Sequence, residues 1–264
     1  MKIILLSGGS GKRLWPLSNN TRAKQFLKLL PSKNGKSESM LERVWSQLKE
    51  LNLIDSVYLS SSHTQIESIH NQLGQNLPII LEPEQRDTFA AISSAVVYLS
   101  SVENLDEEEI VCILPVDPFV ETNFFKKVIE LSNIVRNDST INIGLIGVSP
   151  TFPSQKYGYI LSNPLPNKKY NMITQFIEKP NSILADNLIK QGALWNTGIF
   201  AFKIGFIMQL LKEKGIPTTY EEIIKNYHDL PKTSFDYEIV ERTNNMAVIT
   251  YQGEWKDLGT WNTV

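Results

Sequence analysis

Hydrophobic positions in the first half of the chain fall into short continuous runs that alternate with longer periodic segments. The continuous runs are typical of buried parallel strands and lie at 2–6, 56–59, 78–81, 110–114 and 141–148. The segments between them carry apolar residues at helical spacing, which predicts helices at about 41–51, 66–73, 89–99 and 124–135. Ser39 and Glu42 have the spacing of a capping box before the first helix. This alternation favours βαβ units and a doubly wound α/β sheet with helices on both faces.

The pattern changes after Pro150. Shorter strand-like segments follow at 157–161, 173–178, 198–203 and 247–251, together with predicted helices at 183–190 and 206–214. We interpret this half as an extension of the same sheet and not as a second folding unit.

Composition limits the class of protein but does not identify its chemistry. With 42% hydrophobic and 20% charged residues, the 264-residue chain fits neither a disordered nor a membrane protein. Its first residues are too weakly apolar for a signal peptide or a membrane span. A net charge of −2 argues against a broad nucleic-acid surface. The single cysteine, Cys112, excludes an intramolecular disulfide and favours a cytoplasmic protein.

A glycine-rich segment directly follows the first predicted strand. Gly8, Gly9 and Gly11 would let the backbone approach a ligand closely and turn N–H groups toward phosphate oxygens. The spacing fits neither a P-loop nor a dinucleotide fingerprint, because leucines stand where each would need a glycine. Arg13 and Lys24 follow closely, and two cations near such a segment favour a polyphosphate ligand over a purely structural turn.

The segment GGSGKRLWPLS at 8–18, followed by KQFL at 24–27, resembles the signature of the sugar-1-phosphate nucleotidyltransferases. Further matches follow in the family's order: LEP at 81–83 with RDT at 86–88, LPVD at 114–117, YGYI at 157–160, FIEKP at 176–180, WNTGIF at 195–200, FDYE at 235–238 and WKDLGTW at 255–261. Within the family, the chain most resembles the mannose-1-phosphate guanylyltransferases.

The resemblance implies a Rossmann-like mixed sheet that forms one catalytic domain over 1–264. Residues 1–150 would bind the nucleotide and residues 151–264 the sugar, without the C-terminal β-helix or isomerase domain of longer relatives.

The reaction implied by the resemblance is attack by a sugar 1-phosphate oxygen on the α-phosphorus of a nucleoside triphosphate, which expels pyrophosphate. Because the nucleophile is already an anion, positioning and charge neutralisation should suffice. Mannose 1-phosphate and GTP, giving GDP-mannose, are the favoured pair. One alternative is the same reaction with another sugar 1-phosphate, such as a heptose, or with another nucleotide. A second alternative is a non-catalytic regulatory subunit built on this fold. The expected partners are thus small molecules and neither nucleic acid nor a membrane, and a homodimer stays open.

The resemblance also implies roles for particular residues. Arg13 would bind the β- and γ-phosphates, Lys24 the α-phosphate and Lys179 the sugar phosphate. Asp117 and Asp257 would hold Mg²⁺, for which two carboxylates and substrate phosphates are a normal ligand set. The other expected nucleotide contacts are Gly8, Gly9, Gly11, Glu82, Pro83, Arg86, Asp87 and Thr88. The other expected sugar contacts are Gly158, Glu178, Asn196 and Asp236.

Base recognition stays open on the sequence alone. The Glu82 carboxylate would suit guanine N1–H and N2–H, and a backbone contact at the same place is the alternative. The chain also departs from the guanylyltransferase pattern: Asp87 replaces a usual asparagine, Pro118 a common histidine and Ala23 a usual proline. These departures bear on the choice of nucleotide and sugar more than on the class of reaction.

Overall fold

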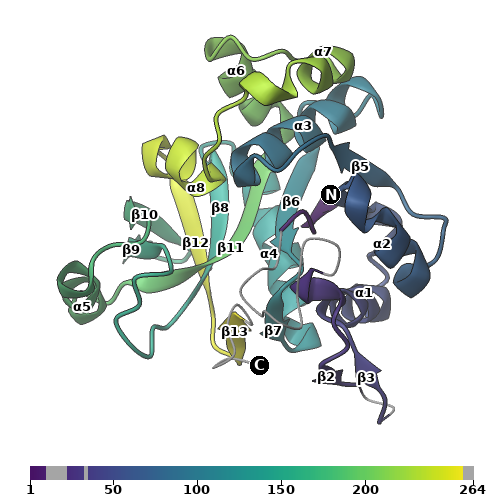
Figure 1. The fold of residues 1–264 in the computed structure, drawn as a ribbon. Coiled ribbons are helices and arrows are strands. Elements are labelled where there is room, and N and C mark those ends of the chain that lie inside the picture. Colours follow the sequence, from purple (N-terminus) through teal and green to yellow (C-terminus); the bar gives the residue numbers. More distant parts are fainter. Residues whose placement is uncertain (10–22, 33–34, 258–264) are drawn as a thin grey trace.

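A computed structural model describes residues 1–9, 23–32 and 35–257 of the chain (Figure 1). Within these residues, nine strands form one mixed sheet in the order β5-β4-β1-β6-β11-β8-β12-β10-β9. The strands are β1 (Lys2–Leu6), β4 (Val57–Ser62), β5 (Ile79–Glu82), β6 (Ile110–Pro115), β8 (Ile143–Val148), β9 (Tyr159–Pro164), β10 (Asn171–Ile177), β11 (Leu194–Lys203) and β12 (Met246–Tyr251). Two small sheets pair β13 (Trp255–Asp257) with β7 (Pro118–Val120) and β2 (Leu30–Pro31) with β3 (Ser37–Glu38).

Helices connect and cover the strands. The α-helices are α1 (Met40–Glu50), α2 (Ile66–Leu73), α3 (Asp87–Ser101), α4 (Thr122–Asn137), α5 (Ser182–Lys190), α6 (Ile204–Glu213), α7 (Tyr220–Lys225) and α8 (Phe235–Glu238). Short 3₁₀ helices are η2 (Lys24–Phe26), η3 (Ile54–Ser56), η4 (His63–Gln65), η5 (Tyr227–Asp229) and η6 (Val240–Arg242). None of the described helices is long and apolar enough to cross a membrane.

Strand direction brings functional segments to one edge of the sheet. β1 pairs in parallel with β4 and β6, and β4 pairs in parallel with β5. The carboxyl ends of these strands therefore lie together, where open α/β sheets bind ligands. β11 runs antiparallel between β6 and β8, while β12 is parallel to β8. The sheet is mixed, as the resemblance implied.

Both faces of the sheet are buried, which explains the continuous apolar runs. On β1, Ile3 and Leu5 join a cluster with apolar residues of α1, α2, α4 and α5. Ile4 points to the opposite face and joins α3, α6, α7 and α8. Figure 1 shows α3, α6 and α7 together at one side of the sheet.

The predicted strands and long helices are confirmed, with shifts of a few residues at their ends. The predicted capping box is also present, because Ser39 Oγ accepts from the Glu42 backbone and Glu42 Oε2 from the Ser39 backbone. The prediction of a strand at 198–203 was too short, since β11 begins at Leu194. A register shift between Asn196 and Phe200, with Gly198 at φ +75°, interrupts the strand pattern, so the residues before it did not give a strand signal in the sequence. The short elements β2, β3, β7, β13, α7 and α8 were not predicted.

Candidate active site

Two cavities share a wall at the carboxyl edge of the sheet. The larger cavity, of about 640 Å³, is lined by Leu6, Ser7, Gly8, Gly9, Lys24, Gln25, Glu82, Gln85, Asp87, Thr88, Ala91, Pro115, Val116, Asp117 and Lys232. The smaller cavity, of about 180 Å³, is lined by Pro115, Asp117, Pro118, Lys156, Tyr157, Gly158, Glu178, Asn196, Thr197, Gly198, Asp236, Trp255 and Asp257. Pro115 and Asp117 line both. The expected nucleotide contacts thus lie mainly on one side of Asp117, and the expected sugar contacts on the other.

Lys24 lies at this shared wall. Its Nζ is 2.6 Å from Asp117 Oδ2, and its side chain is only 13% exposed. The preceding residue, Ala23, is fully buried and adopts φ −68°, a value that proline also favours. The departure from the family's proline therefore leaves this backbone conformation in place.

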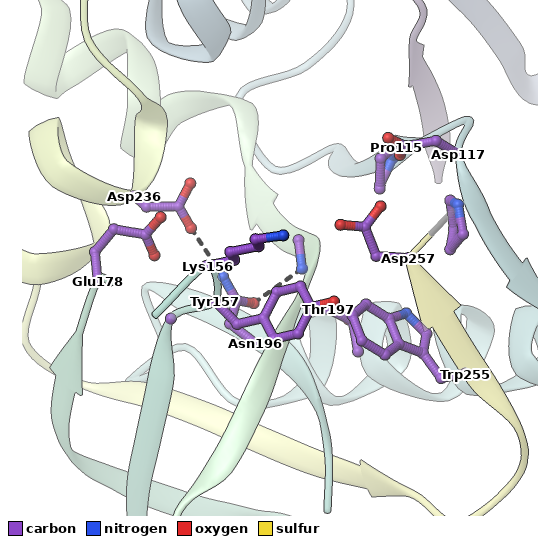
Figure 2. A pocket seen from close by; sticks show the side chains of 13 residues that line it. Pro115, Asp117, Lys156, Tyr157, Glu178, Asn196, Thr197, Asp236, Trp255 and Asp257 are labelled. Carbon is purple, nitrogen blue, oxygen red and sulfur yellow. Dashed lines mark hydrogen bonds between the residues drawn. The ribbon is translucent and has the colours of Figure 1, made fainter. Parts of the chain in front are cut away.

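Asp117 and Asp257 are brought together by the small sheet of β7 and β13. Asp257 stands opposite Pro118 in the antiparallel register, and Asp117 directly precedes Pro118. Both carboxylates face the smaller cavity (Figure 2). Burial, followed by the charges of Asp257 and Asp117, raises the pKa of Tyr157 to about 12. The pairing of β7 with β13 thus places the two aspartates close together, although they are far apart in the sequence.

The donor set at this point suits a hard divalent cation. Two carboxylates leave room for water and phosphate oxygens, which is how Mg²⁺ is usually bound. The described residues contain no group of three or more His, Cys, Asp or Glu side chains that could hold a metal ion. The two carboxylates therefore suit a cation that takes its remaining ligands from a substrate, and they do not form a closed structural metal site.

Aromatic side chains pack around Trp255, which lies on the same strand as Asp257. Tyr157 packs edge-on against Trp195 and Trp255, with ring centroids 4.8 and 5.5 Å away. Figure 2 shows Trp255 next to Asp257 on the wall of the smaller cavity. These contacts hold β13 against the loop that carries Tyr157.

Glu178 and Asn196 form the opposite wall of the smaller cavity. Glu178 is 8% exposed, and a side chain at Gly158 would place its Cβ 2.6 Å from Glu178 Oε2. Only glycine therefore leaves room for this carboxylate. Asn196 Nδ2 donates to Asp236 Oδ1 at 2.8 Å, and Asn196 Oδ1 accepts from the Gly198 backbone at 3.1 Å.

Burial raises the pKa of two carboxylates on this wall. Burial, then the charge of Glu178, raises the pKa of Asp236 to about 7. Burial also raises the pKa of Glu178, although the ammonium group of Lys179 lies 2.6 Å from Glu178 Oε1 and opposes the shift. Burial alone would lower the pKa of Lys179, but its bond to Glu178 raises it. Lys179 therefore stays charged beside the cavity, at a backbone φ of +47°.

Glu82 forms the floor of the larger cavity. It is 5% exposed, and its Oε1 accepts from Ser60 Oγ at 2.8 Å. A Cβ at Gly8 would lie 2.7 Å from both carboxylate oxygens, so Gly8 permits this close packing. Burial raises the pKa of Glu82, and the Ser60 bond offsets only part of that shift.

The remaining expected nucleotide residues divide into two groups. Asp87 and Thr88 line the larger cavity at the start of α3, where Asp87 has φ +67°. Pro83 and Arg86 do not line it. Arg86 instead donates from Nε to the Leu230 carbonyl. Gly11 and Arg13 lie outside the described residues.

Comparison with known proteins shows the family of the chain. The family model of the nucleotidyl transferases ("Nucleotidyl transferase") matches residues 2–264. The chain belongs to the nucleotidyl transferase family. The resemblance found in the sequence motifs is thereby confirmed.

The chain is 32% identical over 291 residues to the mannose-1-phosphate guanylyltransferase of Escherichia coli, covering 99% of this chain and 60% of that protein. The chain thus spans about three fifths of the length of this protein and of a second curated relative, from Vibrio cholerae.

Solved structures agree with the α/β fold. A structure from Thermus thermophilus, described as a mannose-1-phosphate geranyltransferase, has a TM-score of 0.82 and 26% identity, covering 98% of this chain and 76% of that one. A Helicobacter pylori structure described as a mannose-6-phosphate isomerase has a TM-score of 0.70 and 25% identity, covering 97% and 99%. The predicted fold class is confirmed.

Several lining residues of this nucleotidyl transferase were not predicted from the sequence. They are Leu6, Ser7, Gln25, Gln85, Ala91, Pro115, Val116 and Lys232 in the larger cavity, and Pro115, Pro118, Lys156, Tyr157, Thr197, Gly198 and Trp255 in the smaller one. Gln25, Tyr157, Thr197 and Trp255 stand inside motifs, so their place next to predicted residues was a usable signal. Lys156 and Lys232 stand outside the quoted motifs.

Proposed function

We propose that this nucleotidyl transferase joins a sugar 1-phosphate to the nucleotidyl group of a nucleoside triphosphate and releases pyrophosphate. The substrates we propose are mannose 1-phosphate and GTP, and the product is GDP-mannose. The observation that carries the proposal is the wall of Pro115 and Asp117 shared by the two cavities. A nucleotide in the larger cavity and a sugar phosphate in the smaller one would bring their reacting groups together beside Asp117. The name of the Escherichia coli relative supports the choice of substrates.

The chain's cations suit the charges of this reaction. Lys24, next to Asp117, lies where an α-phosphate would bridge the two cavities. Lys179, bound to Glu178, lies on the sugar side and would bind the phosphate of the incoming sugar. Fixed positive groups at both phosphates lower their repulsion and stabilise the charge of the transition state.

Asp117 and Asp257 would hold Mg²⁺, which supplies charge neutralisation at the phosphates when bound. Both carboxylates line the smaller cavity next to the shared wall, where Asp117 Oδ2 is bound to Lys24. The sugar oxygen that attacks is an anion already, so no side chain has to remove a proton from it.

Groups suited to a base and to a sugar line the two cavities. In the larger cavity, the Glu82 carboxylate would accept from guanine N1–H and N2–H, a donor pair that adenine lacks. In the smaller cavity, Glu178 and Asn196 would bind sugar hydroxyls. Glu178 Oε2 is buried without a hydrogen-bond partner among the described residues, so it has an acceptor to offer.

One charge bears on the choice of substrate. Asp87 lines the larger cavity, and its charge contributes to the raised pKa of Glu178 and of Asp236 in the smaller one. The usual asparagine would be neutral. This extra negative charge acts on residues of both cavities, which is the reason to test other sugars and nucleotides alongside the favoured pair.

The test is a substrate panel with the purified chain and Mg²⁺. Pyrophosphate release is measured for each nucleoside triphosphate with mannose 1-phosphate, glucose 1-phosphate and a heptose 1-phosphate. We expect the highest kcat/KM for GTP with mannose 1-phosphate. A higher value for another pair would reassign the substrates and keep the reaction. Binding of GTP without turnover for any sugar would favour a regulatory subunit.

A further inference from the structure

The smaller cavity contains a lysine that the mechanism above does not use. Among the described residues that line this cavity, Lys156 is the one cation. Lys179, the cation expected from the motifs, is bound to Glu178 Oε1 at 2.6 Å and is not among the lining residues. Lys24 lines the larger cavity and is bound to Asp117. Lys156 forms no ion pair with another described residue, so its ammonium group is available to a ligand.

Hydrogen bonds hold the backbone on both sides of Lys156. Before it, Ser154 Oγ accepts from the Lys156 backbone at 3.1 Å, and the Ser154 carbonyl accepts from Tyr159 Oη at 2.9 Å. After it, the Tyr157 carbonyl accepts from the Lys179 backbone at 3.2 Å. Lys156 is therefore held beside the smaller cavity, on a segment that adjoins the segment of Lys179.

The side chain of Lys156 extends toward acidic residues of the cavity. In Figure 2 it extends into the space between Asp236 and Asp257. Asp117 and Glu178 also line this cavity, so a sugar phosphate would enter a space lined by four carboxylates. Like charges repel, and the repulsion is stronger where water is partly excluded. A phosphate dianion therefore needs a positive group inside the cavity, and Lys156 is exposed enough to meet it.

We propose that Lys156 binds the phosphate of the sugar 1-phosphate, together with Lys179. The Lys156 ammonium group would donate to phosphate oxygens and offset the carboxylates as the phosphate approaches the wall of Pro115 and Asp117. Lysine suits this role because its charge is compact and its stem is flexible, so the ammonium group can follow the phosphate. This inference rests on the proposed function for the class of substrate, and it adds a binding residue that the motifs did not indicate.

The experiment replaces Lys156 with methionine in the full chain, because methionine keeps most of the apolar stem and removes the charge. Calorimetry with Mg²⁺ present measures binding of mannose 1-phosphate, glucose 1-phosphate and the heptose 1-phosphate of the substrate panel. For each sugar phosphate that wild type binds, we expect Kd to rise about tenfold, as the loss of one charged hydrogen bond at an exposed position would predict. Kd for GTP should stay within about twofold, since Lys156 does not line the larger cavity.

Two further variants separate the charge of Lys156 from its place in the fold. Lys156→Arg keeps a positive group at the cavity, so Kd for the sugar phosphates should stay within about threefold of wild type. Lys169 is an exposed lysine in the same half of the chain and lines neither cavity. Lys169→Met removes the same charge and should leave Kd for the sugar phosphates and for GTP unchanged.

Three results would overturn the assignment. The first is equal sugar phosphate binding by wild type and Lys156→Met, including the case in which neither binds any of the three. The second is an equal loss of GTP binding, and the third is binding by Lys156→Arg as weak as that by Lys156→Met. Because these measurements need no turnover, they decide the role of Lys156 even if no substrate pair is active, an outcome that would count against the proposed function alone.

Discussion

At the scale of single residues, the site is built on carboxylates that are costly to bury. Glu178 and Asp236 lie on one wall of the smaller cavity, and Lys179 is the cation bound to Glu178. Asp236 accepts a hydrogen bond from Asn196, and its raised pKa indicates that its charged form is disfavoured in the folded chain. Such a group lowers stability in exchange for a polar wall suited to sugar hydroxyls.

Asp236→Asn should therefore stabilise the ligand-free protein at high pH. Asparagine keeps the Oδ1 acceptor for Asn196 but carries no charge. The folded pKa of about 7 exceeds the usual value near 4, so wild-type stability falls as pH rises from about 4 to about 7 and then levels off. Urea unfolding should show the variant more stable by roughly 1–3 kcal/mol at pH 8. Near pH 4 the difference should be close to zero.

The exposed Asp55 of η3 supplies the control, since Asp55→Asn should change stability by under about 0.5 kcal/mol at either pH. Glu178, Lys179 and Asp87 also act electrostatically on Asp236. A pH-independent difference between wild type and Asp236→Asn would show that these neighbours, and not Asp236, carry the titration.

At the scale of elements, side-chain hydrogen bonds fix how the second half joins the first. Asp138 ends α4 and accepts from Thr140 Oγ1 and from Tyr170 Oη, both at 2.6 Å. Tyr170 directly precedes β10, so this carboxylate ties the end of a helix to the start of a strand far along the chain. The bonds from Thr140, then from Tyr170, hold the pKa of Asp138 well below its usual range.

Asp138→Asn should destabilise the protein at neutral pH. A carboxylate with a lowered folded pKa stabilises the native state above its unfolded pKa of about 4, and that stabilisation is lost as pH falls further. We expect a loss of about 1–2 kcal/mol at pH 7, because charged hydrogen bonds weaken to neutral ones at a partly exposed site. Denaturant unfolding at pH 7 and pH 3 measures it, and the difference between the variant and wild type should be smaller at pH 3 than at pH 7.

A surface ion pair gives the comparison for this prediction. Asp186 lies 2.6 Å from Lys190 on α5 with both side chains largely exposed, so Asp186→Asn should cost under about 0.5 kcal/mol. An equal cost for Asp138→Asn would mean that the link between α4 and β10 contributes no more than a solvated pair.

At the scale of the whole molecule, the site exists because distant segments meet. Asp117 follows β6 near the middle of the chain, whereas Asp257 belongs to the last described strand. The pairing of β7 with β13 brings them together, and the aromatic contacts of Trp255 with Tyr157 hold the same strand in place. Both halves of the chain therefore contribute residues to the smaller cavity.

Asp257→Asn should lower kcat by at least about 100-fold, with the fold intact. The amide keeps the shape of the side chain but removes a charge that would bind Mg²⁺. Pyrophosphate release over a Mg²⁺ titration, with circular dichroism as the check on folding, measures the effect. Glu254→Gln, at an exposed position of the same segment paired with Lys256, should keep wild-type kcat. Full activity in Asp257→Asn would remove this residue from the metal site.

The sequence by itself determined the elements whose signal is local. Apolar runs predicted the buried strands, helical spacing predicted the long helices, and Ser39 with Glu42 marked a helix start, because each depends on residues a few positions apart. The motifs indicated the family and the order of the site residues along the chain. Short elements such as β7 and β13 were missed because a few residues carry too little pattern and form only with a partner.

Tertiary structure alone decided which of these residues act together. It placed Lys24 on Asp117, Glu82 beneath Gly8 and Gln65 on the Gly9 carbonyl. It also directed Arg86 to the Leu230 carbonyl and away from the lining of the larger cavity. None of these contacts produces a periodic pattern in the sequence, because each joins segments that only strand order and packing bring together. Protonation likewise depends on burial and neighbouring charge, so the raised pKa of Asp236 could be read only from the folded chain.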